Sequence, residues 1–156
     1  MSADDHMRRA IALSLEMMRS GKGGPFGAVV VKDGAIVGEG YNQVTATNDP
    51  TAHAEVVAIR RACQALETFD LTGAEIYTSC EPCPMCLAAI YWARIGKIYY
   101  ANDRSDAAAA GFRDDYLYDE LPLPLDQRAV PIMPLLRAEG KAAFDEWMLK
   151  PDKVQY

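Results

Sequence analysis

The sequence predicts an α/β protein in which a β-sheet is flanked by helices. Patterns typical of helices alternate with patterns typical of strands along all 156 residues. Half of the residues are apolar and 24% are charged, an ordinary balance for a globular protein with a core. Neither a repeat nor a low-complexity linker interrupts the chain. We therefore expect one domain over residues 1–156, ending in a polar tail at residues 150–156.

The first predicted element is a helix with a clear start and end. Ser2 and Asp5 have the spacing of a capping box, with aspartate in place of the usual glutamate. Apolar side chains then recur at helical spacing, at Met7, Ile11, Leu15 and Met18. The glycines and the proline within residues 21–25 end this helix.

A β-hairpin is the next expected feature. Residues 26–32 and 35–41 are rich in β-branched and apolar side chains, and Asp33-Gly34 between them is typical of a two-residue hairpin turn. Asn42 follows the second strand, where it could serve either as a turn residue or as part of a site.

A second long helix is predicted to start at Asp49-Pro50, with the aspartate as N-cap and the proline at the first helical position. Its expected apolar stripe comprises Ala52, Val56, Ile59, Cys63 and Leu66. Cys63 is therefore interpreted as a buried small hydrophobic residue. His53 and Glu55 lie two residues apart and can converge only at the end of a helix, which is where these start signals place them.

The rest of the chain continues the alternation. In order, we expect a strand at residues 75–79, a helix from Pro82 to Gly96, a strand at 97–101, a short helix at 105–111 and a last helix at 141–149. Residues 130–136 are apolar but contain Pro131 and Pro134, so they form at best an edge strand.

The charge of the chain argues against nucleic acid and membrane partners. The net charge is −6, and residues 102–156 hold eleven acidic and seven basic side chains, a net charge of −4. No apolar run approaches the ~20 residues that span a bilayer. Three of the four cysteines fall within seven residues, which is typical of a metal or redox site in a reducing compartment. We expect a cytoplasmic protein without a secretory signal.

Two short motifs together predict a zinc site. Residues 53–55 read H-A-E, and residues 82–86 read P-C-P-M-C. Catalytic zinc takes three protein ligands and keeps a fourth position open for water, and His53, Cys83 and Cys86 supply that number. The two cysteines are one helical turn apart at a helix N-terminus, whose partial positive charge favours thiolates. We therefore expect one Zn²⁺ ion per subunit.

Glu55 is the expected proton carrier of this site. Zinc lowers the pKa of a bound water molecule, so that a hydroxide nucleophile forms near neutral pH. A carboxylate beside the metal that is not a ligand can accept the water proton and pass it to a leaving group. We therefore predict that Glu55 is a catalytic general base and then a general acid.

Other uses of the cysteines fit the sequence less well. A structural zinc site would need a fourth ligand, which Cys80 could supply, but Glu55 would then have no role. An iron–sulfur motif needs a further cysteine four residues after Cys86, where Ile90 stands. A thioredoxin-like C-x-x-C pair needs no partnered H-x-E motif. We assign Cys80 to packing beside the site.

Together these motifs resemble the zinc deaminases of nucleosides and nucleobases, the cytidine deaminase-like superfamily. The flanking residues, at 24–29, 48–55 and 77–92, are similar to the bacterial guanine deaminases within it, and the resemblance extends over nearly the whole chain. It implies a three-layer α/β/α sandwich with a five-stranded mixed sheet. It also implies a homodimer with one zinc ion in each subunit.

The resemblance further implies residues that bind a purine. Asn42 would hydrogen-bond the base, the Ala54 backbone would contact it, and Phe26 would help to wall the pocket. Asp114 would match a carboxylate that binds the edge of guanine and relays a proton, and it is a second catalytic candidate. From the sequence alone, Asp114 is one of two adjacent loop acids, and such acids are usually solvated.

The C-terminal tail has a specific role only by resemblance. Tyr156 would cover an active site, either that of its own subunit or that of a neighbour to which the tail is swapped. Trp92 would contribute to substrate binding at such an interface, although a tryptophan on a helix more often packs in a core. Without the resemblance, residues 150–156 would be expected to fray.

The implied reaction is the hydrolytic deamination of guanine to xanthine and ammonia, in purine catabolism or salvage. Guanosine, cytosine and ammeline-like triazines are alternative substrates for the same chemistry. A tRNA adenosine deaminase should have a basic surface for phosphates, which this acidic chain does not predict. The alternative from another class is a zinc-stabilised interaction module without activity, in which Glu55 would be dispensable.

Overall fold

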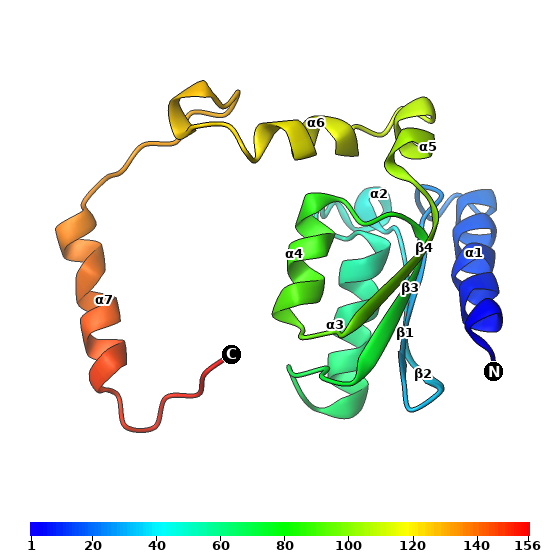
Figure 1. Cartoon of the computed structure of the whole chain (residues 1–156), viewed down its shortest axis with the longest axis horizontal. Helices are drawn as coiled ribbons and strands as arrows, with labels where there is room; N and C mark the ends of the chain where they lie inside the picture. The colour runs from blue at the N-terminus through cyan, green and yellow to red at the C-terminus, as the bar shows by residue number, and fades with distance from the viewer. The chain divides into compact units, whose positions relative to one another are not determined.

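The computed structural model describes residues 1–156 (Figure 1). Its elements, in order, are α1 (Ala3–Arg19), β1 (Gly27–Lys32), β2 (Ala35–Tyr41), α2 (Val44–Thr47), α3 (Ala54–Leu66), β3 (Ala74–Cys80), α4 (Pro84–Trp92), β4 (Lys97–Asn102), α5 (Arg104–Ala109), α6 (Asp114–Glu120), a 3-10 turn (Leu125–Gln127) and α7 (Arg137–Leu149). They fall into two compact units, Met1–Tyr118 and Asp119–Tyr156.

The sheet lies in the first unit and has four strands in the order β2-β1-β3-β4. β1 pairs antiparallel with both β2 and β3, and β3 pairs parallel with β4, so the sheet is mixed as predicted. α1 covers one face while α3 and α4 cover the other, which confirms the three layers (Figure 1). The prediction of a fifth strand is wrong, because residues 130–136 join no sheet. Pro131 and Pro134 lack the amide donors that a strand ladder requires.

Two local signals at the start of the chain are confirmed. The Ser2 hydroxyl accepts a hydrogen bond from the Asp5 amide, and the Asp5 carboxylate accepts one from the Ser2 amide, which is the predicted capping box. Asp33 and Gly34 both have positive φ angles, of 51° and 78°, as a two-residue type I′ hairpin turn requires. β1 and β2 therefore meet at the predicted turn.

The helix that follows His53 starts later than predicted. Asp49 does not cap it, because its carboxylate accepts hydrogen bonds from the amide and the hydroxyl of Thr51, at 2.9 and 2.6 Å, in a turn before the helix. The N-cap is His53 itself, and α3 begins at Ala54. A short helix that the sequence did not reveal, α2, precedes this turn.

The buried face of α3 also differs from the predicted stripe. Its fully buried apolar residues are mainly the alanines Ala54, Ala58 and Ala62, whereas Cys63 is only half-buried. These alanines face the glycines of β2, where the helix and the sheet approach closely. A Cβ atom added at Gly40 would lie 2.1 Å from the Ala54 carbonyl oxygen. Small side chains on both elements therefore decide which face of α3 packs.

The close approach of α3 to β2 predicts that Gly40→Ala destabilises the protein by about 2–3 kcal/mol, the upper part of the range of about 1–3 kcal/mol for overpacking a core. The melting temperature should fall by at least about 5 °C, which differential scanning calorimetry can measure. Gly140→Ala is the matched control, because its added methyl group meets nothing within 4 Å on α7. Equal melting temperatures for the two variants would contradict the prediction.

The second half of the first unit follows its predicted order. α4 begins with Cys83 as N-cap and Pro84 at the first helical position, and Asp103 caps α5 in a second capping box with Asp106. α6 was not predicted, because its seven residues are too few to show a helical period.

The second unit has no core of its own. α7 begins at Arg137 rather than at the predicted Lys141, and no residue of Asp119–Tyr156 is buried. Many of its large apolar side chains are exposed, namely Leu121, Leu125, Val130, Ile132, Met133, Leu135, Leu136, Phe144, Met148, Leu149, Val154 and Tyr156. Across both units, no helix combines the length and the apolar character that crossing a membrane requires.

Candidate metal centre

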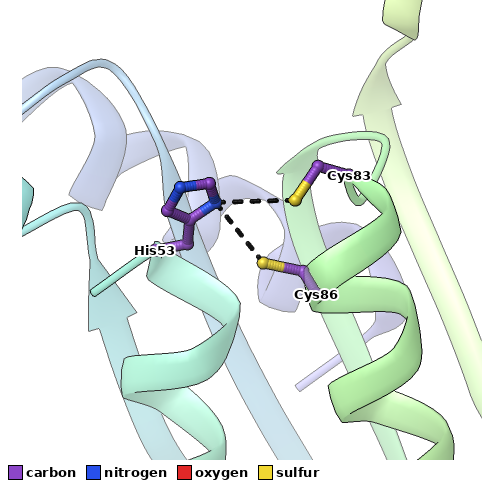
Figure 2. A group of neighbouring side chains, drawn as sticks. All are labelled: His53, Cys83 and Cys86. Carbon is purple, nitrogen blue, oxygen red and sulfur yellow. Dashed lines mark hydrogen bonds between the residues drawn. The ribbon is translucent and has the colours of Figure 1, made fainter. Parts of the chain in front are cut away.

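The three predicted zinc ligands lie together at the N-terminal ends of α3 and α4. His53 Nδ1 lies 3.6 Å from Cys83 Sγ and 3.5 Å from Cys86 Sγ (Figure 2). All three ligand atoms lie within 4.8 Å of one another. His53 and Cys83 are the N-caps of the two helices, and Cys86 lies in the first turn of α4. The predicted convergence at helix ends is confirmed.

These separations fit a tetrahedral zinc ion. Zinc–sulfur bonds of about 2.3 Å and zinc–nitrogen bonds of about 2.0–2.1 Å, at tetrahedral angles, place nitrogen and sulfur about 3.5 Å apart. The observed distances of 3.5 and 3.6 Å match that requirement. Three protein ligands leave a fourth coordination position for water or substrate, as in catalytic rather than structural zinc sites.

The thiols of Cys83 and Cys86 form a hydrogen-bonded pair in which Cys83 ionises readily. The Cys86 thiol donates a hydrogen bond to Cys83, which lowers the pKa of Cys83 to about 4 and raises the pKa of Cys86. The hydrogen bond with Cys83 is also the main reason that the pKa of His53 is raised. Metal binding requires two thiolates and a neutral imidazole, so binding of zinc releases the protons that this cluster retains.

Glu55 lies beside the ligands without joining the ligand group. It is the second residue of α3, and only 8% of its surface is exposed. Burial, which disfavours the charged form, raises the pKa of its carboxyl to about 7. A carboxyl with such a pKa can both accept and donate a proton near neutral pH. This environment suits the predicted role of Glu55 in acid–base catalysis.

A cavity of about 310 Å³ adjoins the metal centre, at the lower end of the range for small-molecule sites. His53, Glu55 and Cys83 form part of its wall. Phe26 and Asn42, which were predicted to contact a substrate, also line the cavity. The structure therefore brings these two residues, which lie 11 to 60 positions before the metal ligands along the chain, to one cavity beside the metal centre.

Asp114 lines the same cavity, although the sequence left it as one of two similar acids. It is the first residue of α6, and desolvation is the main reason that the pKa of its carboxyl is raised. The neighbouring Asp115 instead has a side chain that is 43% exposed and pairs with Arg113 at 3.1 Å. The resemblance singled out Asp114, and in the fold Asp114 lines the cavity whereas Asp115 does not.

Asn42 and Phe26 each make a contact that shapes the cavity wall. Asn42 Oδ1 accepts a hydrogen bond from the Val44 amide at 3.1 Å, so Asn42 is a turn residue as well as a wall residue. Phe26 packs edge-on against Phe112, with 4.8 Å between the ring centroids. Phe112 was missed in the sequence. Its one signal was its place two residues before Asp114.

Three other predicted contacts are not tested by this geometry. Ala54 opens α3 and is buried. Trp92 ends α4 with 68% of its surface exposed, and Tyr156 ends the second unit with 74% exposed. Their contacts with a substrate stay predictions.

Cys80 lines the cavity but lies outside the ligand group. Burial is the main cause that raises the pKa of its thiol to about 12. Its Sγ donates a hydrogen bond to the Asp103 carbonyl oxygen at 3.8 Å. Its sulfur is not among the three ligand atoms that lie within 4.8 Å of one another, so Cys80 packs beside the site rather than joining the ligands.

Cys80→Ala is therefore expected to retain about one zinc ion per chain, as a site with three protein ligands requires. Cys83→Ala should instead lose most of the metal, because one of the three ligands is gone. Metal analysis of the purified proteins by atomic spectrometry measures both. A Cys80→Ala protein that binds as little zinc as Cys83→Ala would identify Cys80 as a fourth ligand.

Residues 1–102 match the family described as cytidine and deoxycytidylate deaminase zinc-binding region. A guanine deaminase of Bacillus subtilis (strain 168) is 49% identical to this chain over 156 residues, which is 100% of both proteins. The X-ray structure of guanine deaminase from Bacillus subtilis matches with a TM-score of 0.97 at 49% identity, covering 100% of this chain and 99% of that one.

More distant matches include both guanine deaminases and tRNA deaminases. The structure of a guanine deaminase from Nitrosomonas europaea is 28% identical with a TM-score of 0.70, and the match covers 93% of this chain and 84% of that one. A tRNA-specific adenosine deaminase of Agrobacterium fabrum is 45% identical over 91 residues, which is 57% of this chain and 60% of that protein. A solved structure from studies of tRNA:A34 deaminases is 34% identical with a TM-score of 0.64, and the match covers 82% of this chain and 95% of that one.

Proposed function

The chain belongs to the cytidine and deoxycytidylate deaminase family, and on this premise we propose that it is a guanine deaminase, a zinc hydrolase that converts guanine and water to xanthine and ammonia. The observation that carries the proposal is 49% identity to a guanine deaminase over the full length of both chains. The acidic composition of residues 102–156 argues against a tRNA substrate, whose phosphates would need a basic surface.

The residues of the metal centre account for the hydrolysis. His53, Cys83 and Cys86 would hold the zinc ion, which would supply Lewis-acid activation of a water molecule. Glu55 accepts a proton from that water as the water oxygen attacks C2 of the purine. Glu55 passes that proton to the ring nitrogen N3, where it stays, and then carries the second water proton to the exocyclic amine, so that the C2–N bond breaks. The water oxygen stays in xanthine, ammonia leaves, and Glu55 ends in its starting protonation state.

The cavity wall has groups that suit guanine. The Asp114 carboxylate is a hydrogen-bond acceptor that complements the N1–H and amino donors of the base. Asn42 offers an amide, and Phe26 offers an apolar ring against which a base can pack. The Ala54 amide is among the first amides of α3, which have no partner within the helix and can donate to a ligand. Asp114, Asn42 and Phe26 line the cavity, and Ala54 lies between His53 and Glu55, which also line it.

Asp114→Asn should lower kcat/KM for guanine by about 10²-fold. The half-buried carboxylate becomes a neutral amide, which cannot accept hydrogen bonds from both the N1–H and the amino group of guanine. Asp115→Asn is the matched control and should change kcat/KM less than twofold, since Asp115 pairs with Arg113 outside the cavity lining. Steady-state rates of ammonia release provide the comparison. Similar losses in the two variants would contradict a substrate role for Asp114.

A homodimer is proposed from the composition of the second unit. Residues of Asp119–Tyr156 include no buried position and many large exposed apolar side chains, and surfaces of this kind usually pack against a partner. A second copy of the chain, with the C-terminal segment swapped, supplies that partner. Trp92 and Tyr156 are exposed aromatic residues of the type enriched at interface cores, and in such a dimer they would cover a substrate. Light scattering should give twice the chain mass of 17.1 kDa.

The location that we propose is the cytoplasm. All four cysteines are free in the structure, and three of them line or form the metal centre and its cavity. Thiols that must stay reduced to hold zinc suit a reducing compartment.

The proposed function is tested by ammonia release from guanine, guanosine, cytosine and adenine, each incubated with the purified, zinc-loaded protein. Guanine should be the preferred substrate, by a factor on the order of 10² or more in kcat/KM, because the cavity pairs its polar edge. Turnover of cytosine or adenine in preference to guanine would contradict the substrate assignment. Turnover of none of the four bases by zinc-loaded protein would favour the interaction module.

A further inference from the structure

A hydrogen bond ties α6 to the segment that carries a metal ligand. The Tyr118 hydroxyl donates to the Pro82 carbonyl oxygen at 2.8 Å. Pro82 is buried and directly precedes Cys83. Tyr118 lies four residues after Asp114, so the two side chains share one face of α6. α6 begins with Asp114, and one turn later its Tyr118 is hydrogen-bonded to the residue next to the metal ligand Cys83.

Arg104 makes a second contact with Tyr118, through the face of its ring. Its guanidinium lies over the ring, with 3.6 Å between Cζ and the ring centroid. Its Nε and Nη2 atoms donate to Glu81 Oε2 at 3.0 and 2.7 Å, and its backbone amide donates to Glu81 Oε1 at 3.1 Å. Glu81, Arg104 and Tyr118 therefore form one cluster that joins α5, α6 and the residues just before Cys83.

Stability alone does not explain this cluster. The Arg104 side chain is 44% exposed, and ion pairs at such sites contribute little to folding. α6 has seven residues, none of them buried, so packing does not hold it in place. Short helices without a buried face are marginal in water. The position of the Asp114 carboxylate consequently depends on the few contacts that fasten α6.

We propose that Tyr118 is a positioning residue, whose hydrogen bond to Pro82 holds Asp114 at the substrate side of the metal centre. The proposal rests on the proposed function, because it assumes that Asp114 contacts guanine. The physical reason is geometric: a group displaced by about 1 Å loses much of its interaction with a bound substrate. Arg104 and Glu81 support the same contact by clamping the Tyr118 ring and the chain next to Pro82.

The test measures guanine binding without turnover, by titration calorimetry of zinc-loaded Glu55→Gln protein. In that background, Tyr118→Phe should raise the Kd for guanine about fivefold, the equivalent of one ordinary hydrogen bond. Phenylalanine keeps the ring beneath Arg104 and removes only the hydroxyl. In a background that also contains Asp114→Asn, Tyr118→Phe should change the Kd less than twofold, because its effect acts through Asp114.

Controls separate positioning from general damage. Tyr116→Phe, on the same helix and 40% exposed, should leave the Kd unchanged. Tyr118→Phe should keep its zinc content and its melting temperature. If that variant does not fold, Arg104→Lys tests the same cluster, because lysine cannot make the two side-chain hydrogen bonds that the guanidinium donates to Glu81. This substitution should raise the Kd for guanine, and the increase should again depend on Asp114.

The possible failures are distinguishable. A Tyr118→Phe protein with an unchanged Kd, with lost zinc, or with an equal effect in the Asp114→Asn background would overturn the positioning role and leave the proposed function intact. Absence of guanine binding by the zinc-loaded Glu55→Gln protein would overturn the proposed function, and the positioning role with it.

Discussion

Glu55→Gln is expected to lower kcat for guanine by about 10³-fold, within the range of about 10²–10⁴ that general acid–base catalysis supplies. Glutamine has nearly the shape of glutamate, but it cannot accept the proton of the attacking water. Zinc should stay bound at one ion per chain, because Glu55 lies outside the ligand group. Ammonia release and metal analysis on the same protein samples measure both quantities.

Glu67→Gln is the matched control for this substitution. Glu67 is the exposed C-cap residue of the same helix, so its substitution should change neither kcat nor zinc content. A Glu55→Gln protein that retains more than a tenth of the kcat would mean that another group, such as Asp114, carries the proton. A Glu55→Gln protein without zinc would mean that the carboxylate supports the metal rather than the reaction.

Removal of zinc by a chelator is expected to reduce guanine turnover to background, and addition of zinc should restore it. Zinc should also stabilise the fold, by about 4 kcal/mol when its free concentration is a thousand times its Kd. For a chain of this length that corresponds to a melting temperature higher by roughly 10 °C. The buried apolar clusters on both faces of the sheet do not include any of the three metal ligands. The metal-free protein should therefore remain folded.

Two substitutions identify the ligands in that experiment. Cys86→Ser should reproduce the chelated protein, with lost zinc, lost turnover and no thermal response to added zinc. Cys63→Ala should respond to zinc like the unmodified protein, because Cys63 lies outside the ligand group on the later part of α3. A Cys86→Ser protein with full zinc content would contradict the ligand assignment.

Local patterns predicted the metal centre because each of its two motifs is short, although His53 lies 30 residues before Cys83. Cys83 and Cys86 are one turn apart on α4, and both start signals, the Pro84 position and the N-cap, lie within two residues of them. His53 required only that a helix begin nearby. It does, although at Ala54 and not at Asp49, because the Asp49 carboxylate is engaged by Thr51. The error in the helix start did not affect the ligand set.

The substrate side of the cavity could not be predicted from spacing. Asn42 lies 70 positions before Phe112 and 72 before Asp114, and each looked like an ordinary loop or turn residue. The resemblance pointed to Asn42 and Asp114, and the structure placed them with Phe112 around one hollow. What separates Asp114 from Asp115 is desolvation, which depends on neighbours brought together by folding.

The sequence by itself determined the alternation of helices and strands, the hairpin turn, the capping box and the two zinc motifs, because each depends on residues a few positions apart. Only the tertiary structure decided the buried face of α3, the four-stranded rather than five-stranded sheet, and the tie between Tyr118 and Pro82. Those features depend on how closely distant segments can approach: the glycines of β2 admit the alanines of α3, and two prolines keep residues 130–136 out of the sheet.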